Sequence, residues 1–575
     1  MEGFGLKVAI AIAGWGLSLA PPIARPPLCV PTPPPAAAPE QPLDRAGVAA
    51  PTATPATTSP TAAVETSRLN AGQFRLTHDL QVRIDPETGR MAGDDRMDVS
   101  RIPNDGFVCF RLHPDLNLRD VTLNGERLDV SRRGNKVRVD LRGHENEPAR
   151  VRVRYDGRIP GPENGPGQLG VYLYDESYWH PNHMGEHGES TLTVTVPREW
   201  SATASGVEQS VREGDNFRSY TWRTPWAGSG LTLAAAQYDV TRDEQSGLPV
   251  RAFLYPNSDV DANALIRRSR DVVNFFEPLF GPYPYDRLDI VESMSEGANA
   301  SPGIILFHPT TLRDAETLDD FLSHEVSHNW WAGALAGYTE RGLWYEAFAE
   351  FSANIFTRGA VDSPIAVRDR HAVLDRWRDV IGANETTPVR DVNSYEPWDE
   401  KNLVAYHKGA YVLHMLRDRL GDEAFFKGMR AFVEDNRASF VSWEDAQSAF
   451  ETASGQDLGG FFSQWLDRGD APSLALEQVG ANAVPGGWSI EGKVRQVQTG
   501  APYDLEVPVV VKTRDGEVHR RNVPVGAREG TFSWTLPAEP ESVEVDPEAR
   551  IFRLRSDSEM WVSSRETPPT TLTWQ

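Results

Sequence analysis

The chain has 575 residues, a formal net charge of -24 and 39% hydrophobic residues, enough for a large core and about three to four domains. No block of basic residues offsets the acidic charge, so the composition argues against a nucleic-acid partner. The two cysteines, Cys29 and Cys109, cannot make a disulfide framework, and their separation indicates no paired metal site. Cysteine usage alone leaves the redox compartment undecided.

The N-terminus, residues 1–20, has the pattern of a signal peptide or an N-terminal anchor. Lys7 precedes an apolar run, Val8 to Ala20, that has signal-peptide length and is too short to span a bilayer comfortably. Cleavage after Ala24 and retention as an uncleaved anchor both remain open. We therefore expect an exported protein that is periplasmic, extracellular or membrane-anchored facing outward, with any membrane attachment made through the N-terminus only.

Two segments of different character follow. Residues 21–67 are dominated by Pro, Ala and Thr, a composition that cannot bury a core and predicts a disordered linker. Residues 68–247 predict an N-terminal β-domain, because Phe74 to Ile84 and Lys136 to Leu141 alternate apolar and polar side chains. Asn124-Gly125 is a hairpin turn signal in the same region.

The apolar period becomes helical in residues 248–471, which predict a mainly α catalytic domain. Helical spacing covers Ala262 to Phe276, Thr317 to Trp331, Leu343 to Phe356, Leu403 to Leu420 and Glu423 to Val433. Strand patterns return in residues 472–555, which predict a C-terminal β-sandwich. Residues 556–575 are expected to be a tail.

The run His324-Glu325-Val326-Ser327-His328 indicates a zinc site. On a helix, residues i and i+4 lie on one face, so the two imidazoles can reach a single metal ion. Glu325 lies beside them, where a carboxylate can take a proton from a metal-activated water. Hydrolytic zinc usually has three protein ligands, so a third is expected from a neighbouring helix.

The helix predicted at Leu343 to Phe356 supplies that third ligand. Glu346 and Glu350 lie four residues apart in an otherwise strongly apolar and aromatic stretch, and therefore share one face. Glu346 is the expected ligand. Glu350, one turn later, is placed to accept a hydrogen bond from a ligating histidine, His324, and so to fix its tautomer.

These motifs resemble the alanyl aminopeptidase and leukotriene hydrolase family, a group of gluzincin zinc peptidases. The resemblance covers most of residues 68–470. The segments that carry it are His324 to Phe351, Phe275 to Tyr285, Trp179-His180-Pro181 and Tyr406 to Leu413. It implies an α+β multidomain protein with a saddle-like N-terminal β-domain, a thermolysin-like catalytic domain and one zinc ion.

The resemblance also implies roles for single residues. His324, His328 and Glu346 match the metal ligands, and Glu325 matches the general base. Tyr406, before Lys408-Gly409, matches the tyrosine that donates a hydrogen bond to the developing oxyanion, a contribution of a few kcal/mol in comparable sites.

One departure from the family bears on the substrate. The family's exopeptidase motif Gly-Ala-Met-Glu-Asn is Gly297-Ala298-Asn299-Ala300-Ser301 in this chain, so the glutamate that holds the substrate's α-amino group is missing. Glu296 is a candidate replacement. Gly297 and Ala298 remain, and the strand can still bind a peptide through its main chain.

We expect a zinc-dependent metallopeptidase that acts on peptide or protein substrates, with an aminopeptidase as the leading prediction. An endopeptidase or oligopeptidase is the first alternative, because the amine-binding glutamate is lost. A non-catalytic peptide-binding protein that retains the fold is the second. The histidine-rich segment His180 to His187 leaves open a second metal, a substrate-contacting lip or a plain surface loop.

Overall fold

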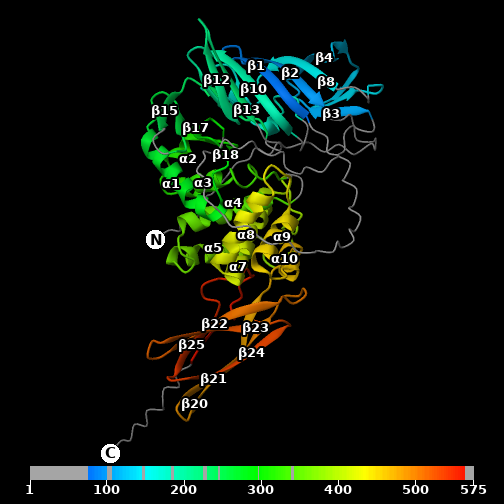
Figure 1. The fold of residues 1–575 in the computed structure, drawn as a ribbon. Coiled ribbons are helices and arrows are strands. Elements are labelled where there is room, and N and C mark those ends of the chain that lie inside the picture. The colour runs from blue at the N-terminus through cyan, green and yellow to red at the C-terminus, as the bar shows by residue number, and fades with distance from the viewer. Residues whose placement is uncertain are drawn as a thin grey trace, which may run out of the picture.

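The computed structural model describes residues 76–99, 106–144, 149–182, 187–224, 230–243, 247–295, 297–337 and 342–563. Three parts follow one another in space as in the chain: a β-domain, a helical part and a second β-rich part (Figure 1). This arrangement confirms the predicted fold class. The predicted signal segment and the predicted linker lie outside the described residues. Across the described ranges, no helix has both the length and the apolar character needed to cross a membrane.

The N-terminal β-domain holds three sheets around a core of its own. Its large sheet follows from alternation, because every second side chain of β2 and β8 is buried. Asn124 and Gly125 both have positive φ, 50° and 97°, as a two-residue hairpin turn requires. The second strand of this hairpin, β5, is only two residues long, and the chain then leaves the large sheet.

The strands of the β-domain have the following bounds. The eight-stranded sheet contains, in spatial order, β12 (Val207–Glu213), β13 (Phe217–Thr224), β10 (His187–Pro197), β1 (Leu76–Asp85), β2 (Arg90–Val99), β8 (Ala149–Arg158), β4 (Leu116–Leu123) and β5 (Glu126–Arg127). The two three-stranded sheets are β3 (Phe107–Arg111), β7 (Lys136–Asp140) and β6 (Val130–Arg133), and β11 (Ser201–Ala204), β14 (Leu233–Ala236) and β9 (Gly170–Leu173).

A five-stranded sheet lies between the β-domain and the helices (Figure 1). Its order is β15 (Asp239–Asp243), β16 (Val250–Leu254), β17 (Leu288–Glu292), β19 (Ile304–Phe307) and β18 (Ala298–Ser301). All five residues of β17 are buried, as expected for a central strand covered on both faces. β18 is the edge strand and pairs antiparallel with β19.

A buried charged cluster fastens the β-domain to this sheet. Asp289 in β17 is fully buried and accepts hydrogen bonds from Arg251 Nη2 at 2.6 Å, Arg287 Nε at 2.9 Å and Thr203 Oγ1 at 2.5 Å. Arg287 also donates to the backbone oxygen of Ala204 at 2.6 Å. Burial alone would raise the pKa of Asp289, but the two guanidinium groups lower it overall. An ionised carboxylate therefore joins β11 to β16 and β17.

The helical part contains ten α-helices in the described residues. They are α1 (Ala262–Phe280), α2 (Pro309–Arg313), α3 (Leu318–Ser327), α4 (Trp344–Thr357), α5 (Pro364–Val380), α6 (Trp398–Lys401), α7 (Gly409–Leu420), α8 (Asp422–Asp435), α9 (Trp443–Ser454) and α10 (Gly459–Leu466). A π-helical segment, Asn402–Lys408, connects α6 to α7.

Two predicted helices differ from the structure. The helix expected to reach Trp331 ends at Ser327. Trp330 and Trp331 are fully buried, but they lie in a turn after the helix, so their apolar spacing reflects burial and not helical structure. The helix expected from Leu403 to Leu420 is π-helical in its first part. Periodicity does not separate an α-turn from a π-turn over so few residues.

The C-terminal part is a β-sandwich, as predicted. One sheet contains β20 (Leu474–Val484), β21 (Gly487–Gln496) and β24 (Glu529–Leu536), and the other contains β23 (Val518–Val525), β22 (Leu505–Thr513), β25 (Pro540–Val545) and β26 (Met560–Val562). The tail expected from residue 556 therefore starts later, because Met560 to Val562 pair with β25.

The sandwich is attached to the helices by polar contacts as well as by a shared apolar core. The Tyr411 hydroxyl of α7 donates to the backbone oxygen of Ala549. Lys408 is fully buried, and its Nζ donates to the backbone oxygens of Arg468 at 2.8 Å and Asp470 at 3.1 Å, in the connection that leads to the sandwich. The π-helical segment is thus tied directly to the C-terminal part.

Candidate metal centre

The packing of α4 against α3 brings the predicted ligands together. His324 lies in the last turn of α3, His328 caps that helix, and Glu346 lies in the first turn of α4. An aromatic layer fixes the two helices: Trp331 contacts Phe348 with ring centroids 5.0 Å apart, and its Nε1 donates to Ser352 Oγ at 3.0 Å. The ligand positions are therefore set by a rigid core.

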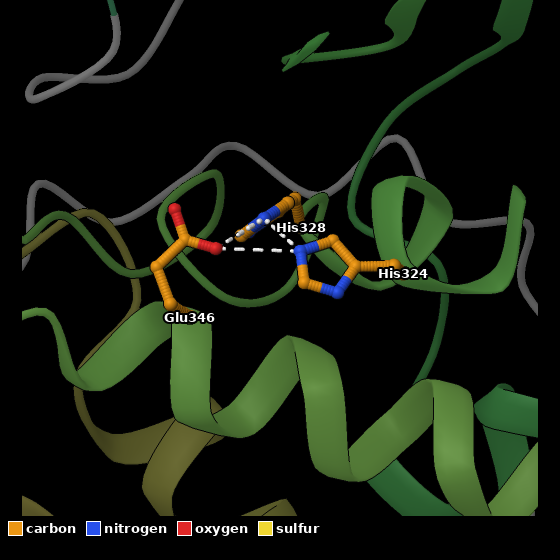
Figure 2. Close-up of side chains that lie close together, drawn as sticks. All are labelled: His324, His328 and Glu346. Carbon is orange, nitrogen blue, oxygen red and sulfur yellow. Dashed lines mark hydrogen bonds and ion pairs between the residues drawn. The ribbon is translucent and has the colours of Figure 1, made fainter. Parts of the chain in front are cut away.

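Three donor atoms converge on one point (Figure 2). The Nε2 atoms of His324 and His328 are 3.2 Å apart, and Glu346 Oε2 lies 3.3 Å from the first and 3.4 Å from the second. Atoms bound about 2.0–2.1 Å from one tetrahedral zinc lie about 3.3 Å from one another. The triangle has the size of one face of such a tetrahedron, and two imidazoles with one carboxylate are typical zinc donors. The donor set fits one zinc ion.

A polar partner on the far side of each imidazole orients the two histidines. His328 Nδ1–H donates to the backbone oxygen of Trp331 at 3.0 Å, which leaves the Nε2 lone pair for a metal. His324 Nδ1 lies 3.6 Å from Glu350 Oε2, the partner that the sequence predicted. Glu350 Oε1 lies 3.5 Å from His407 Nδ1, so this carboxylate joins α3, α4 and the π-helical segment.

His407 was not predicted from the sequence. It lies next to Tyr406, and its role depends on a contact across two helices that spacing does not reveal.

The charges of these groups are strongly coupled. Burial alone would lower the pKa of His324, but the hydrogen bonds with Glu346 and Glu350 outweigh it and raise the pKa to about 10. Burial alone would raise the pKa of both carboxyls, yet the adjacent histidines hold the pKa of Glu346 and of Glu350 well below the usual range. Both are therefore carboxylates, ready to pair with positive charge on a histidine or a metal.

Glu325, the predicted general base, is buried beside the triangle, with an exposed fraction of 6%. The backbone amide of Ala300 in β18 lies close to its carboxylate and favours the ionised form. Burial raises the pKa of Glu325, while the charges of His324 and His328 oppose that shift. The geometry therefore places a proton acceptor between the metal ligands and the edge strand.

Tyr406, the predicted oxyanion donor, lies beside the donor triangle. Its ring is stacked on that of His324, with centroids 5.9 Å apart and an interplanar angle of 11°. Its hydroxyl lies close to Glu346, and burial together with that carboxylate keeps the pKa of Tyr406 well above its usual value. The phenol therefore stays protonated and can donate.

The predicted substrate strand borders the site. Gly297 has a φ of 76°, and its backbone oxygen accepts from the amide of His308 at 2.9 Å, which starts the pairing of β18 with β19. Ala298 lies in β18, and at its other end Ser301 Oγ hydrogen-bonds Thr232 Oγ1 of the β-domain at 2.7 Å. Glu296, the candidate amine anchor, lies outside the described residues.

The histidine-rich segment is only partly described. His180 is fully buried, and its Nε2 lies 3.1 Å from Asp175 Oδ1. Residues 183–186 lie outside the described residues, so a second metal in this segment stays a prediction.

A known family domain coincides with this site. The peptidase family M1 domain matches residues 267–465. The chain carries a peptidase family M1 domain. The matched range includes all three residues of the donor triangle, Glu325 and Tyr406, and it agrees with the resemblance that the motifs indicate.

Named relatives and a solved structure agree with the M1 domain. Aminopeptidase 2 of Candida albicans is 24% identical over 312 residues, which are 50% of this chain and 33% of that protein. Mitochondrial aminopeptidase 2 of Saccharomyces cerevisiae is 26% identical over 368 residues, which are 59% of this chain and 38% of that protein. The chain thus spans less than two fifths of the length of these two relatives.

An M1 zinc metallopeptidase from Deinococcus radiodurans has a similar fold, with a TM-score of 0.55 and 21% identity. The match covers 68% of this chain and 93% of that one.

Glu350 offers a test of how the metal ligands are oriented. Glu350→Gln removes the negative charge behind His324 while keeping the shape of the side chain. We expect zinc affinity to fall by about 10- to 100-fold, as when such a partner of a ligating histidine is lost. Competition with a chelator of known affinity measures the change. Glu434→Gln, an exposed position on α8, is the matched control; equal affinity in the two variants would contradict the orienting role.

Proposed function

We propose that this protein is a zinc-dependent metallopeptidase that hydrolyses peptide bonds, with an aminopeptidase as the leading assignment. The observation that carries the proposal is the donor triangle of His324, His328 and Glu346 with Glu325 beside it. The M1 domain and the relatives named as aminopeptidases support it. A variant of the Deinococcus enzyme has been solved with a Tyr-Ser-Ala substrate, which supports a peptide as the substrate here.

Zinc, Glu325 and Tyr406 each contribute one part of the proposed reaction. When bound, zinc supplies a Lewis acid that polarises the scissile carbonyl and lowers the pKa of a water. Glu325 accepts the proton of the attacking water on a carboxylate oxygen and then delivers it to the leaving amine. Tyr406 donates its hydroxyl hydrogen to the carbonyl oxygen as negative charge develops there.

The position of Glu325 relative to β18 links the chemistry to the substrate. An edge strand presents unpaired main-chain groups, to which an extended peptide can add as a further strand. Because the Ala300 amide of β18 lies close to the Glu325 carboxylate, a peptide that adds along β18 passes close to the proton acceptor. Gly297 and Ala298 belong to the same stretch of chain, which supports a substrate-binding role for its main chain.

Replacing the general base tests the reaction. We expect Glu325→Gln to lower kcat for peptide hydrolysis by at least about 10²- to 10⁴-fold, because the amide cannot accept the proton. Tyr406→Phe removes one donor to the oxyanion, and a loss of about 10²- to 10³-fold is expected. Metal analysis of each purified variant should still give one zinc per chain.

Hydrolysis that is unchanged in Glu325→Gln, or purified wild-type protein without zinc, would contradict the mechanism. Wild-type protein that binds zinc and peptides without cleaving them would favour the non-catalytic alternative.

The second candidate function is an endopeptidase or oligopeptidase. Ala300 stands where the family carries the glutamate that holds the substrate amine, and a methyl group cannot make that ion pair. Peptides that differ only in N-terminal acetylation separate the two activities by mass spectrometry. For an aminopeptidase we expect the free peptide to be shortened from its N-terminus and the acetylated one to stay intact. Equal cleavage of both at internal bonds would establish the endopeptidase.

We further propose that the protein is exported, with a signal peptide or N-terminal anchor at residues 1–20 and a flexible linker at residues 21–67. Cys109 in β3 supports this location, because it is disulfide-bonded and such bonds persist in oxidising compartments. The sequence has one other cysteine, Cys29, which lies outside the described residues.

Peptide mapping of the native protein without reductant tests this location. We expect a linked pair of peptides that contain Cys29 and Cys109, together with recovery of the protein outside the cytoplasm. Two free thiols in protein recovered from the cytoplasm would contradict the proposal.

A further inference from the structure

Lys401 places a positive charge on the same wall of the site as Tyr406. It ends α6 and immediately precedes the π-helical segment. In a π-helix, residues i and i+5 are linked through the backbone and lie about one turn apart, so positions 401 and 406 lie near one face. Both residues lie near the same carboxylate, because the charge of Glu346 acts on the Tyr406 hydroxyl and on the Lys401 ammonium.

A chain of aromatic contacts connects this ammonium to the metal ligands. Lys401 Nζ lies 5.2 Å from the centroid of the Trp398 ring. The Trp398 ring in turn contacts the ring of Tyr406, with centroids 5.9 Å apart, and Tyr406 is stacked on His324. The order His324, Tyr406, Trp398, Lys401 therefore runs outward from the donor triangle.

The ammonium has unused donor capacity. Lys401 is only 7% exposed, and its Nζ donates to the backbone oxygen of Ser394 at 3.2 Å. Among the described residues, no carboxylate lies within 4.0 Å of it. The adjacent acids are engaged elsewhere: Asp399 with Arg376 at 3.7 Å, and Glu400 with the Thr387 amide at 3.0 Å. An ammonium has three donor hydrogens, and one is used here.

A nearly buried cation without a carboxylate partner is costly unless another group provides the negative charge. Burial lowers the pKa of Lys401, and the charge of Glu346 opposes that shift. Once zinc is bound, its positive charge offsets the negative charge of Glu346, so Glu346 offers Lys401 less compensation. The remaining positive charge lies on the Tyr406 side of the donor triangle.

We propose that Lys401, supported by Trp398, forms a subsite for a carboxylate of the peptide substrate. This proposal rests on the proposed peptidase function and names the substrate class: peptides that carry a carboxylate near the scissile bond. Two parts of a peptide can supply this carboxylate: an acidic side chain, or the C-terminal carboxylate of a short peptide. A charge-assisted hydrogen bond to such a group would orient the peptide relative to Tyr406 and the metal.

Four peptides distinguish the two sources. They share the backbone Ala-Xaa-Ala-Ala, with Xaa as Glu or Gln, and each ends in a free carboxylate or an amide. We expect wild-type protein to prefer the acid over its neutral counterpart by about tenfold or more in kcat/KM, at one of the two positions. A preference for Glu over Gln would assign the side chain, and a preference for the free terminus over the amide would assign the chain end.

Two variants of Lys401 and one control test the residue itself. Lys401→Met should bring the acid-to-neutral ratio close to one, mainly through KM, whereas Lys401→Arg should retain most of the preference because the charge remains. Lys427→Met, an exposed position on α8, should keep the wild-type ratio. A purely structural role for Lys401 would lower the rates for acid and neutral peptides alike and leave their ratio unchanged.

A binding measurement makes the result independent of turnover. Calorimetric titration of the same peptides into zinc-loaded Glu325→Gln, with and without Lys401→Met, should show the same loss of preference. Cleavage of the neutral peptides with no acid preference, or a preference that survives Lys401→Met, would overturn the Lys401 subsite and leave the peptidase proposal intact. A wild-type protein that cleaves none of the four while its variants still bind acids selectively would overturn the peptidase proposal instead.

Discussion

The packing of α4 against α3 is the constraint on which the site depends. The aromatic layer of Trp331, Phe348 and Trp344 fixes the depth and the rotation of α4 relative to α3, and a small rotation of either helix would carry Glu346 away from the histidine pair. The donor atoms lie within 3.2–3.4 Å of one another, and a proton on a histidine or a bound metal ion stabilises this close approach. The packing of the core and the close approach of the charged donor atoms therefore belong together.

The substrate side of the site depends on a different set of contacts. β18 is held at one end by the start of its pairing with β19 and at the other by the Ser301–Thr232 hydrogen bond to the β-domain. The β-domain is in turn fastened to the central sheet through Asp289. The β-domain therefore helps to position the edge strand that borders Glu325.

The π-helical segment combines several tasks in seven residues. Tyr406 faces Glu346, His407 contacts Glu350, and Lys408 donates to backbone oxygens in the connection to the C-terminal sandwich. A π-helical turn rotates successive side chains by less than an α-turn does, so neighbouring residues can reach partners that a regular helix would separate. Through Lys408, the position of the sandwich is coupled to the position of the phenol.

The sequence alone determined the type of chemistry and much of the architecture. The spacing of His324, Glu325 and His328 predicted ligands on one helix face, Glu346 and Glu350 followed from a second apolar helix, and strand alternation predicted the two β-rich parts, because these features repeat with the local geometry of helices and strands. The end of α3 before Trp330 and the π-helical start at Asn402 were not predictable, since burial and helix geometry produce the same apolar spacing. Only the tertiary structure brought His407 to Glu350, Ala300 to Glu325 and Lys401 near Glu346. These contacts join residues far apart in the chain, and their distances depend on how whole helices and strands pack.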